Sequence, residues 1–292
     1  MEERIVGVNA PLDLNSENLA DRLRQTAAFG FQCVELNLGT LPLIVEGEVC
    51  QPYVRYLSQV MKQIPLHYTA HIGFGLELRD LPRYELHKKV LFASIDICGQ
   101  LGIARLVLHF EKASDVEREE TAFLQAHREA AEYAAQKNVM LCMENVEIEH
   151  YRKVIEMVRR VDHPAFKMTL DLGHLFLFVN HFGGDFLQAV GECAPYVEHL
   201  HINDNTGHFE PMRLSNFSEY RHLPMGYRIA FGSGDIHLPP LWGKVPIREA
   251  LEILYSFDYR GIFLCEYENT LYMPFGKEIA ETTRKLIEEV FS

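Results

Sequence analysis

The sequence VMLCMEN (residues 139–145) is a short apolar run that ends in two polar residues. A stretch with helical spacing separates it from the next such run, FKMTLD (residues 166–171). The same unit recurs along the chain, and each apolar run predicts a strand. The eight predicted strands are Ile5–Ala10, Cys33–Leu38, Leu66–Ile72, Arg105–Phe110, Val139–Asn145, Phe166–Asp171, Val197–Asn203 and Gly261–Glu266. Strands that alternate with helices imply parallel pairing, because a parallel connection needs a crossover.

Helical periodicity fills the spaces between these runs. One predicted apolar stripe comprises Leu86, Val90, Ala93, Ile97 and Leu101. Eight strand–helix units predict an α/β fold, a single (β/α)8 TIM barrel over residues 1–292, with a long loop after the seventh strand (205–245). In a barrel this loop lies at the mouth, where long connections often serve function. An open doubly wound sheet is the alternative, but no Gly-x-Gly-x-x-Gly turn follows the first run.

Charge and composition exclude several classes of partner and of protein. The chain has 292 residues, 28 Lys and Arg against 41 Asp and Glu, and a formal net charge of −13. Such a chain has no overall attraction to nucleic acid or to an anionic membrane. Its apolar runs are far shorter than the ~20 residues of a membrane helix. No signal peptide is visible and the six cysteines form no Cys-x-x-Cys pair, so we expect reduced thiols and a cytoplasmic location. Self-association into a homo-oligomer is left open.

Residue types that bind metals end six consecutive predicted strands. They are His71, His109, Glu144, Asp171, His201 and Glu266. Active sites of barrels are built at these strand ends from several strands. Strand alternation directs Glu144 and Glu266 to the barrel interior, where several carboxylates together imply a cation. Two Glu, one Asp and one His suit Mn²⁺, Mg²⁺, Co²⁺ or Zn²⁺.

Five further polar residues have more than one interpretation. Glu35 is either a substrate contact or half of a buried ion pair. His67 and His199 are expected as hydrogen-bonded core histidines, the commonest role of a lone histidine in a strand. Asp235 and His237 are expected to be ordinary loop residues.

Several segments resemble one superfamily in order along the chain. They are Gly30–Leu36, His71–Gly73, Glu144–Asn145, Asp171–His174, His201–Asp204, Gly232–Ile236 and Glu266. These segments are similar to those of the xylose isomerase-like barrels, the group of sugar phosphate isomerases/epimerases and endonuclease IV. The resemblance covers nearly the whole length. It implies that one divalent metal is held by Glu144, Asp171, His201 and Glu266, and that the two glutamates also act as acid and base.

The resemblance implies an isomerase or epimerase of a sugar, sugar phosphate or polyol ketone. A metal-chelated carbonyl acidifies the neighbouring C–H, and one glutamate removes a proton that the other returns. His174 would then contact a substrate hydroxyl, and Arg228 would clamp a phosphate or carboxylate. His71 and His109 would contact substrate oxygen or hold a second metal, and Phe74 would form an apolar wall. The expected partner is a small carbohydrate.

The same resemblance leaves three alternatives. An inosose-dehydratase-like lyase would follow proton removal with loss of a β-hydroxyl. An endonuclease IV-like phosphoesterase would use three zinc ions on abasic DNA, and its third zinc needs Asp-x-His just before the Gly-x-Gly segment. Gly226 and Arg228 stand at those positions, so the sequence predicts no third metal site and disfavours the nuclease. A non-catalytic sugar-binding barrel is the third alternative.

Overall fold

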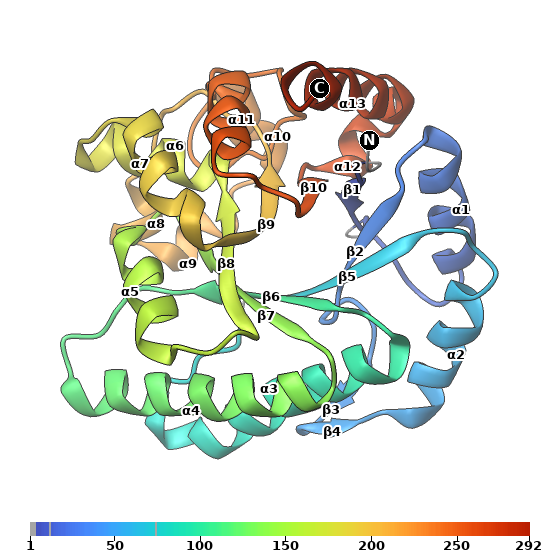
Figure 1. Cartoon of the computed structure of the whole chain (residues 1–292), viewed down its shortest axis with the longest axis vertical. Helices are drawn as coiled ribbons and strands as arrows, with labels where there is room; N and C mark the ends of the chain where they lie inside the picture. The colour runs from blue at the N-terminus through green and yellow to red at the C-terminus, as the bar shows by residue number, and fades with distance from the viewer. Residues whose placement is uncertain (1–3, 12, 74) are drawn as a thin grey trace.

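Eight parallel strands close into a barrel in the computed structural model, which describes residues 4–11, 13–73 and 75–292 (Figure 1). Around the ring they are β1 (Val6–Asn9), β10 (Ile262–Cys265), β9 (Val197–Ile202), β8 (Phe166–Asp171), β7 (Met140–Asn145), β6 (Arg105–Phe110), β5 (His67–Ile72) and β2 (Cys33–Asn37). Pairing of β2 with β1 closes the ring. The predicted (β/α)8 barrel is confirmed, and each strand lies within a predicted run.

A layer of helices surrounds the strands (Figure 1). The principal helices are α1 (Leu19–Phe29), α2 (Gln51–Met61), α3 (Tyr84–Leu101), α4 (Glu117–Gln136), α5 (Arg152–Val161), α6 (Leu172–Phe182), α7 (Phe186–Cys193), α11 (Ile247–Ser256) and α13 (Gly276–Val290). Each presents an apolar face to the barrel, as Leu57, Ile97 and Leu254 show with no exposed surface. All six cysteines are free thiols. No helix in the described part of the chain is long and apolar enough to cross a membrane.

The predicted face of α3 is partly wrong. Ala93 and Ile97 are buried as expected, but Leu86 is 40% exposed, and the core takes Leu91 and Ile95 instead. A hairpin of β3 (Ile44–Val45) and β4 (Glu48–Val49), missed in the sequence, lies against α3, and Leu86 faces this hairpin instead of the barrel core (Figure 1).

His67 also departs from the prediction of a buried histidine. It begins β5 at the end of the barrel away from the mouth, and it is exposed. An apolar run alone does not distinguish the first residue of a strand from its middle.

The connection between β9 and α11 contains three short helices, α8 (Met212–Ser215), α9 (Phe217–Tyr220) and α10 (Met225–Phe231). Its two arms are tied together by an antiparallel bridge in which Asp204 and Leu238 exchange two backbone hydrogen bonds of 2.9 Å. The Asp204 carboxylate also accepts from the backbone N–H of Val245 at 2.9 Å. These bonds hold the connection over the carboxyl ends of the strands.

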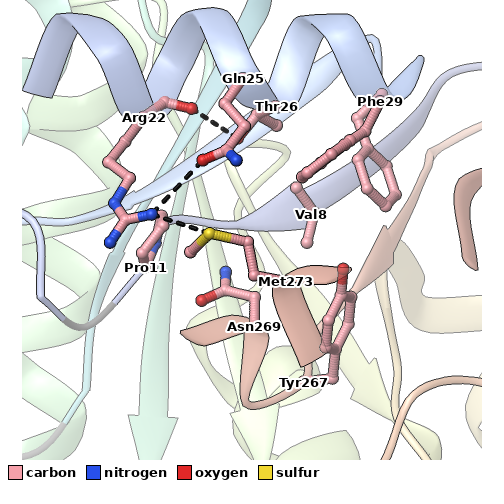
Figure 2. Close-up of a pocket in the computed structure, with 10 residues that line it drawn as sticks. Val8, Pro11, Arg22, Gln25, Thr26, Phe29, Tyr267, Asn269 and Met273 are labelled. Atoms are coloured by element: carbon pink, nitrogen blue, oxygen red, sulfur yellow. Dashed lines mark hydrogen bonds between the residues drawn. The ribbon is translucent and has the colours of Figure 1, made fainter. Parts of the chain in front are cut away.

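A small pocket lies between α1 and the α12 helix (Asn269–Tyr272) that follows β10 (Figure 2). Arg22 reaches across it and donates to Met273 Sδ at 2.8 Å and to Gln25 Oε1 at 3.3 Å. The volume of the pocket is about 20 Å³, which leaves room for a water molecule. It is therefore too small for a sugar.

Candidate functional site

Four of the predicted strand-end residues converge at the mouth. Ligand atoms of Glu144, Asp171, His201 and Glu266 lie within 4.8 Å of one another. The strand register produces this arrangement, because β9 aligns His201 with Asp171 on β8 and with Leu264 on β10. Parallel strands in register bring their carboxyl ends to one level, so residues far apart in the sequence meet there.

We call Glu144, Asp171, His201 and Glu266 the metal set. His201 lies at its centre. Its Nδ1 is 3.2 Å from Glu144 Oε1, 3.0 Å from Glu266 Oε2 and 3.9 Å from Asp171 Oδ2. Burial disfavours the charged imidazole, but the surrounding carboxylates, Glu266 foremost, raise the pKa of His201 well above its usual value. Burial likewise opposes ionisation of Glu266, but the charge of His201 lowers the pKa of Glu266 to about 2.

Three carboxylates therefore share one buried imidazole. Burial, together with the charges of Glu266 and Glu144, raises the pKa of Asp171 to about 7. The buried Glu266 Oε2 has no aligned hydrogen-bond donor among the described residues. An excess of buried negative charge, in a set of carboxylate oxygens and one imidazole nitrogen, fits a divalent cation.

Two asparagines hold Asp171 in place. Its Oδ2 accepts from Asn203 Nδ2 at 2.6 Å, and Asn145 pairs with its backbone N–H and carbonyl, both at 3.0 Å. Its Oδ1 caps α6 by accepting from the backbone N–H of His174 at 2.6 Å. Glycine is required at position 173, because a Cβ there would overlap Asn203 Oδ1. The Asp-Leu-Gly-His sequence thus encodes both the helix cap and the close approach of β9.

A second cluster joins His71, His109 and Glu144. His71 Nε2 is 3.0 Å and His109 Nε2 is 3.4 Å from Glu144 Oε2. Gly73 makes room for both rings, since a Cβ there would lie 2.5 Å from each. Glu144 therefore directs Oε2 to this cluster and Oε1 to His201, which is the arrangement of a carboxylate that can bridge two cations.

A third cluster joins His174, Asp235 and His237. His237 Nε2 is 2.9 Å and His174 Nε2 is 3.4 Å from Asp235 Oδ2. Asp235 and His237, predicted as ordinary loop residues, instead lie with His174 in a group whose ligand atoms are close enough to hold a metal ion. The required Asp-x-His follows the Gly-x-Gly segment rather than preceding it, and the bridge between Asp204 and Leu238 carries it to the mouth.

The third cluster is charged and its backbone is strained. His237 has φ of 42°, a conformation that is costly for a residue with a side chain. Its Nδ1 donates to the backbone carbonyl of Glu266 at 3.0 Å. Burial opposes charging of His237, but Asp235 raises the pKa of His237 to about 10. His237 thus joins the β9–α11 connection to the end of β10.

Glu35 lies beneath His201 rather than at the mouth. It is 2% exposed, accepts from Thr69 Oγ1 at 2.9 Å, and has His199 Nε2 at 3.0 Å. Its other oxygen is 3.0 Å from His201 Nε2. Burial opposes ionisation, but His201 and His199 hold the pKa of Glu35 below its usual value. Of its two predicted roles, this geometry corresponds to the buried ion pair, and His199 is confirmed as a hydrogen-bonded core histidine.

A pocket of about 380 Å³ opens between these clusters and the short helices of the β9–α11 connection. Its wall includes His109, His174, Asp235, Arg213, Tyr220 and Arg228. The predicted substrate contacts His109, His174 and Arg228 therefore face one cavity, large enough for a small-molecule ligand. Phe74, predicted as an apolar wall, lies outside the described residues.

Comparison with known proteins identifies the family. The model of the xylose isomerase-like TIM barrel family matches residues 23–289. The chain belongs to this family. No curated protein matches the sequence.

Solved structures of xylose isomerase-like barrels share this fold at low sequence identity. A family member from Mycobacterium smegmatis in complex with magnesium has a TM-score of 0.73 and 17% identity, over 99% of this chain and 97% of that one. D-psicose 3-epimerase from Clostridium cellulolyticum H10 with D-tagatose gives 0.70 and 15%, over 99% of each chain. The 3-keto-D-glucoside 4-epimerase from E. coli gives 0.69 and 14%, over 97% of this chain and 100% of that one.

Within this xylose isomerase-like barrel, sequence reasoning missed the roles of Asn203, Asp235 and His237. The role of Asn203 could have been predicted, because its amide follows the candidate ligand His201 by two residues at the end of a strand. Asp235 and His237 had only their spacing, which puts two side chains on one side of an extended segment. Nothing local showed that this segment returns to His174.

Proposed function

We propose that this chain is a divalent-metal-dependent isomerase or epimerase of a sugar, sugar phosphate or polyol ketone. The observation that supports it best is the approach of two glutamates from different strands to one atom. Glu144 Oε1 and Glu266 Oε2 lie 3.2 and 3.0 Å from His201 Nδ1. Two carboxylates on either side of a reacting carbon are what proton exchange at that carbon requires. Family members named as D-psicose 3-epimerase and 3-keto-D-glucoside 4-epimerase support the same reaction class.

The metal set would hold the cation through Glu144, Asp171, His201 and Glu266. The chemistry that a divalent cation supplies there is polarisation of a carbonyl and its neighbouring hydroxyl. The chain's own glutamates then move the proton. Glu144 would remove it from the carbon beside the carbonyl. Glu266, after taking a proton from solvent, would return one to the opposite face, and Glu144 would release its proton to solvent.

The protonation state of Glu144 favours its role as the base. Burial opposes ionisation of Glu144, but His201 and His109 hold the pKa of Glu144 well below its usual value, so it is an ionised base at neutral pH. His71 and His109 fix the direction of its second oxygen. His174 lies on the pocket wall, within reach of a substrate hydroxyl.

The experiment combines metal stoichiometry with exchange of carbon-bound hydrogen. Purified protein is analysed by elemental mass spectrometry, and ketoses are incubated with it in D2O and followed by NMR. We expect about one equivalent of metal and deuterium at the carbon next to the carbonyl. Glu144→Gln should lose at least about 100-fold in exchange rate. Glu198→Gln is the matched control, because Glu198 is the second residue of β9, at the far end of the barrel, where its Oε1 accepts from Arg105 Nη2 at 2.8 Å.

Each outcome separates the candidate reactions. Full turnover by Glu144→Gln would refute the acid–base assignment. Absence of metal after reconstitution, together with absence of exchange, would leave a sugar-binding barrel. A product with enone ultraviolet absorbance would identify dehydration in place of isomerisation.

The endonuclease IV-like alternative gains support from one observation. Among the described residues, four groups of His, Asp and Glu could hold a metal ion, and Glu144 belongs to two of them. One of the four adds Glu35 to His71, His201 and Glu266. Such a set suits several zinc ions acting on a phosphodiester. Two or three zinc equivalents, with cleavage of an abasic-site duplex, would favour this activity over the epimerase. One equivalent without cleavage would favour the epimerase.

A further inference from the structure

The two ring nitrogens of His201 face different groups. Nδ1 faces the metal set, 3.2 Å from Glu144 Oε1 and 3.0 Å from Glu266 Oε2. Nε2 faces the interior of the barrel and lies 3.0 Å from Glu35 Oε1. A neutral imidazole carries its proton on one nitrogen and binds a metal through the other, and the group beside the protonated nitrogen decides which nitrogen is free.

Glu35 reaches His201 across the interior of the barrel. Glu35 lies on β2 and His201 on β9, and the strands β1 and β10 separate these two in the ring (Figure 1). Both side chains are buried. Neither Glu35 Oε1 nor His201 Nε2 has an aligned hydrogen bond to a described residue. Their contact is therefore electrostatic, and no hydrogen bond from another described residue competes for either atom.

The second oxygen of Glu35 is fixed by two hydrogen bonds. Oε2 accepts from Thr69 Oγ1 at 2.9 Å and from His199 Nε2 at 3.0 Å. The parallel register of β2 and β5 places Thr69 beside Glu35, and both donors are buried. The carboxylate is therefore held in one orientation, in which Oε1 faces His201.

Glu35 adds a fourth carboxylate to the three that surround the imidazole of His201 in the metal set. A further buried negative charge costs free energy unless positive charge balances it, and an apolar side chain would fill the space without that cost. A divalent cation in the metal set balances this charge. A carboxylate beside Nε2 in turn favours the proton on that nitrogen, which leaves the lone pair of Nδ1 for the metal.

We propose that Glu35 is a positioning residue for the metal: its carboxylate holds the ring of His201 with Nδ1 directed at the metal set, and thereby raises the affinity of that set for a divalent cation. Thr69 acts through Glu35, because it fixes the orientation of the carboxylate. The inference rests on the proposed function only in taking the metal set as a cation site, and it does not depend on which reaction follows.

Metal affinity tests the proposal without a turnover assay. Metal-free protein is titrated with Mn²⁺, and free Mn²⁺ is measured by electron paramagnetic resonance. Glu35→Gln keeps the size of the side chain but removes its charge, and it should weaken Mn²⁺ binding by about 10–100-fold. Glu198→Gln is the matched control, because Glu198 lies on the same strand as His201 but is paired with Arg105 at the far end of the barrel. An unaltered affinity in Glu35→Gln would overturn the proposal.

Two variants of Thr69 test the same contact with the charge of Glu35 in place. Thr69→Val removes the hydroxyl and keeps the shape, so Glu35 loses one hydrogen bond, and we expect about three- to tenfold weaker Mn²⁺ binding. Thr69→Ser should recover most of that loss, because it retains the hydroxyl. Equal affinities of the two variants would refute the role of Thr69. If Glu35→Gln does not fold, the same result would overturn the whole proposal.

Imidazole NMR gives a readout that a merely structural role of Glu35 would not change. In protein with 15N-labelled histidine and saturating Zn²⁺, His201 should carry its proton on Nε2 and none on Nδ1. His201→Gln identifies the signals by their absence. Glu35→Gln should alter this pattern, whereas a loss of stability alone would leave it unchanged. A proton on Nδ1 in the unaltered protein, or an unchanged pattern in Glu35→Gln, would refute the positioning role.

The proposed function and this inference fail in different ways. Binding of Mn²⁺ that depends on Glu35, without exchange of carbon-bound hydrogen, would count against the isomerase alone. Exchange that requires Glu144, with Mn²⁺ affinity independent of Glu35, would count against this inference alone. Absence of Mn²⁺ and Zn²⁺ binding by the unaltered protein would overturn both.

Discussion

His127 links the stability of the barrel to pH. It lies on α4, is 2% exposed, and donates from Nδ1 to the carbonyl of Phe123 at 2.7 Å. Its ring packs against Phe123 and Phe166, with centroids 4.3 and 5.8 Å away. Burial lowers the pKa of His127 to about 4, because the charged imidazole would lose its water.

The sign and size of the effect follow from this pKa. An unfolded histidine titrates near 6.5, so below that pH the unfolded state binds a proton that the folded state resists. The contribution of neutral His127 to the free energy of unfolding is therefore fully present above pH 6.5 and falls as the pH decreases towards 4. At about 1.4 kcal/mol per pH unit, the loss at pH 5 is about 2 kcal/mol.

Urea denaturation at pH 7.5 and pH 5.0 measures this loss in the protein and in His127→Leu. Histidines of the mouth with raised pKa values, such as His201 and His237, contribute pH dependence of the opposite sign, but they contribute it to both proteins. We expect the unaltered protein to lose about 2 kcal/mol more than the variant. His208→Leu, at an exposed site, is the control. Parallel losses in the protein and His127→Leu would refute the reasoning.

Two further predictions concern the mouth. Gly73→Ala places a Cβ 2.5 Å from the rings of His71 and His109, so we expect a loss of about 1–3 kcal/mol in stability and at least a tenfold slower turnover. Gly226→Ala has open space around its Cβ and should change neither quantity in the same denaturation and exchange assays. Chelation should lower the Tm, because the clustered carboxylates lose their counter-charge. Glu266→Gln should abolish that difference in Tm between metal-loaded and chelated samples, and an undiminished difference would contradict its place in the metal set.

Sequence patterns predict the structure best where one physical rule, such as the alternation of side chains, applies along a whole strand. Alternation along β7 requires Glu144 to face the interior with Cys142, and both are fully buried. Parallel register then aligns Asp171 with His201, and Glu144 with Thr169, two residues before Asp171, without any knowledge of the helices. The barrel and the metal set follow from these local patterns.

Contacts between segments that are far apart in the sequence cannot be predicted from such local patterns. Leu86 faces a hairpin rather than the barrel core, and the two-residue strands of that hairpin carry no clear alternation. The meeting of His174 with Asp235 depends on where a connection of about forty residues turns back. The deciding contact is the bridge between Asp204 and Leu238, which is made by backbone atoms and therefore has no side-chain signature.

The β9–α11 connection contributes both to the third cluster and to the wall of the mouth pocket. Asp235 contributes its carboxylate to the third cluster, and its backbone carbonyl accepts from Arg228. A change at Arg228 is therefore transmitted to the third cluster through one residue. If that cluster binds a metal, Arg228→Gln should lower metal stoichiometry by at most one equivalent while Glu144, Asp171 and Glu266 retain theirs. Loss of all metal would instead show that the connection supports the metal set itself, because the end of β10 is bound to it through His237.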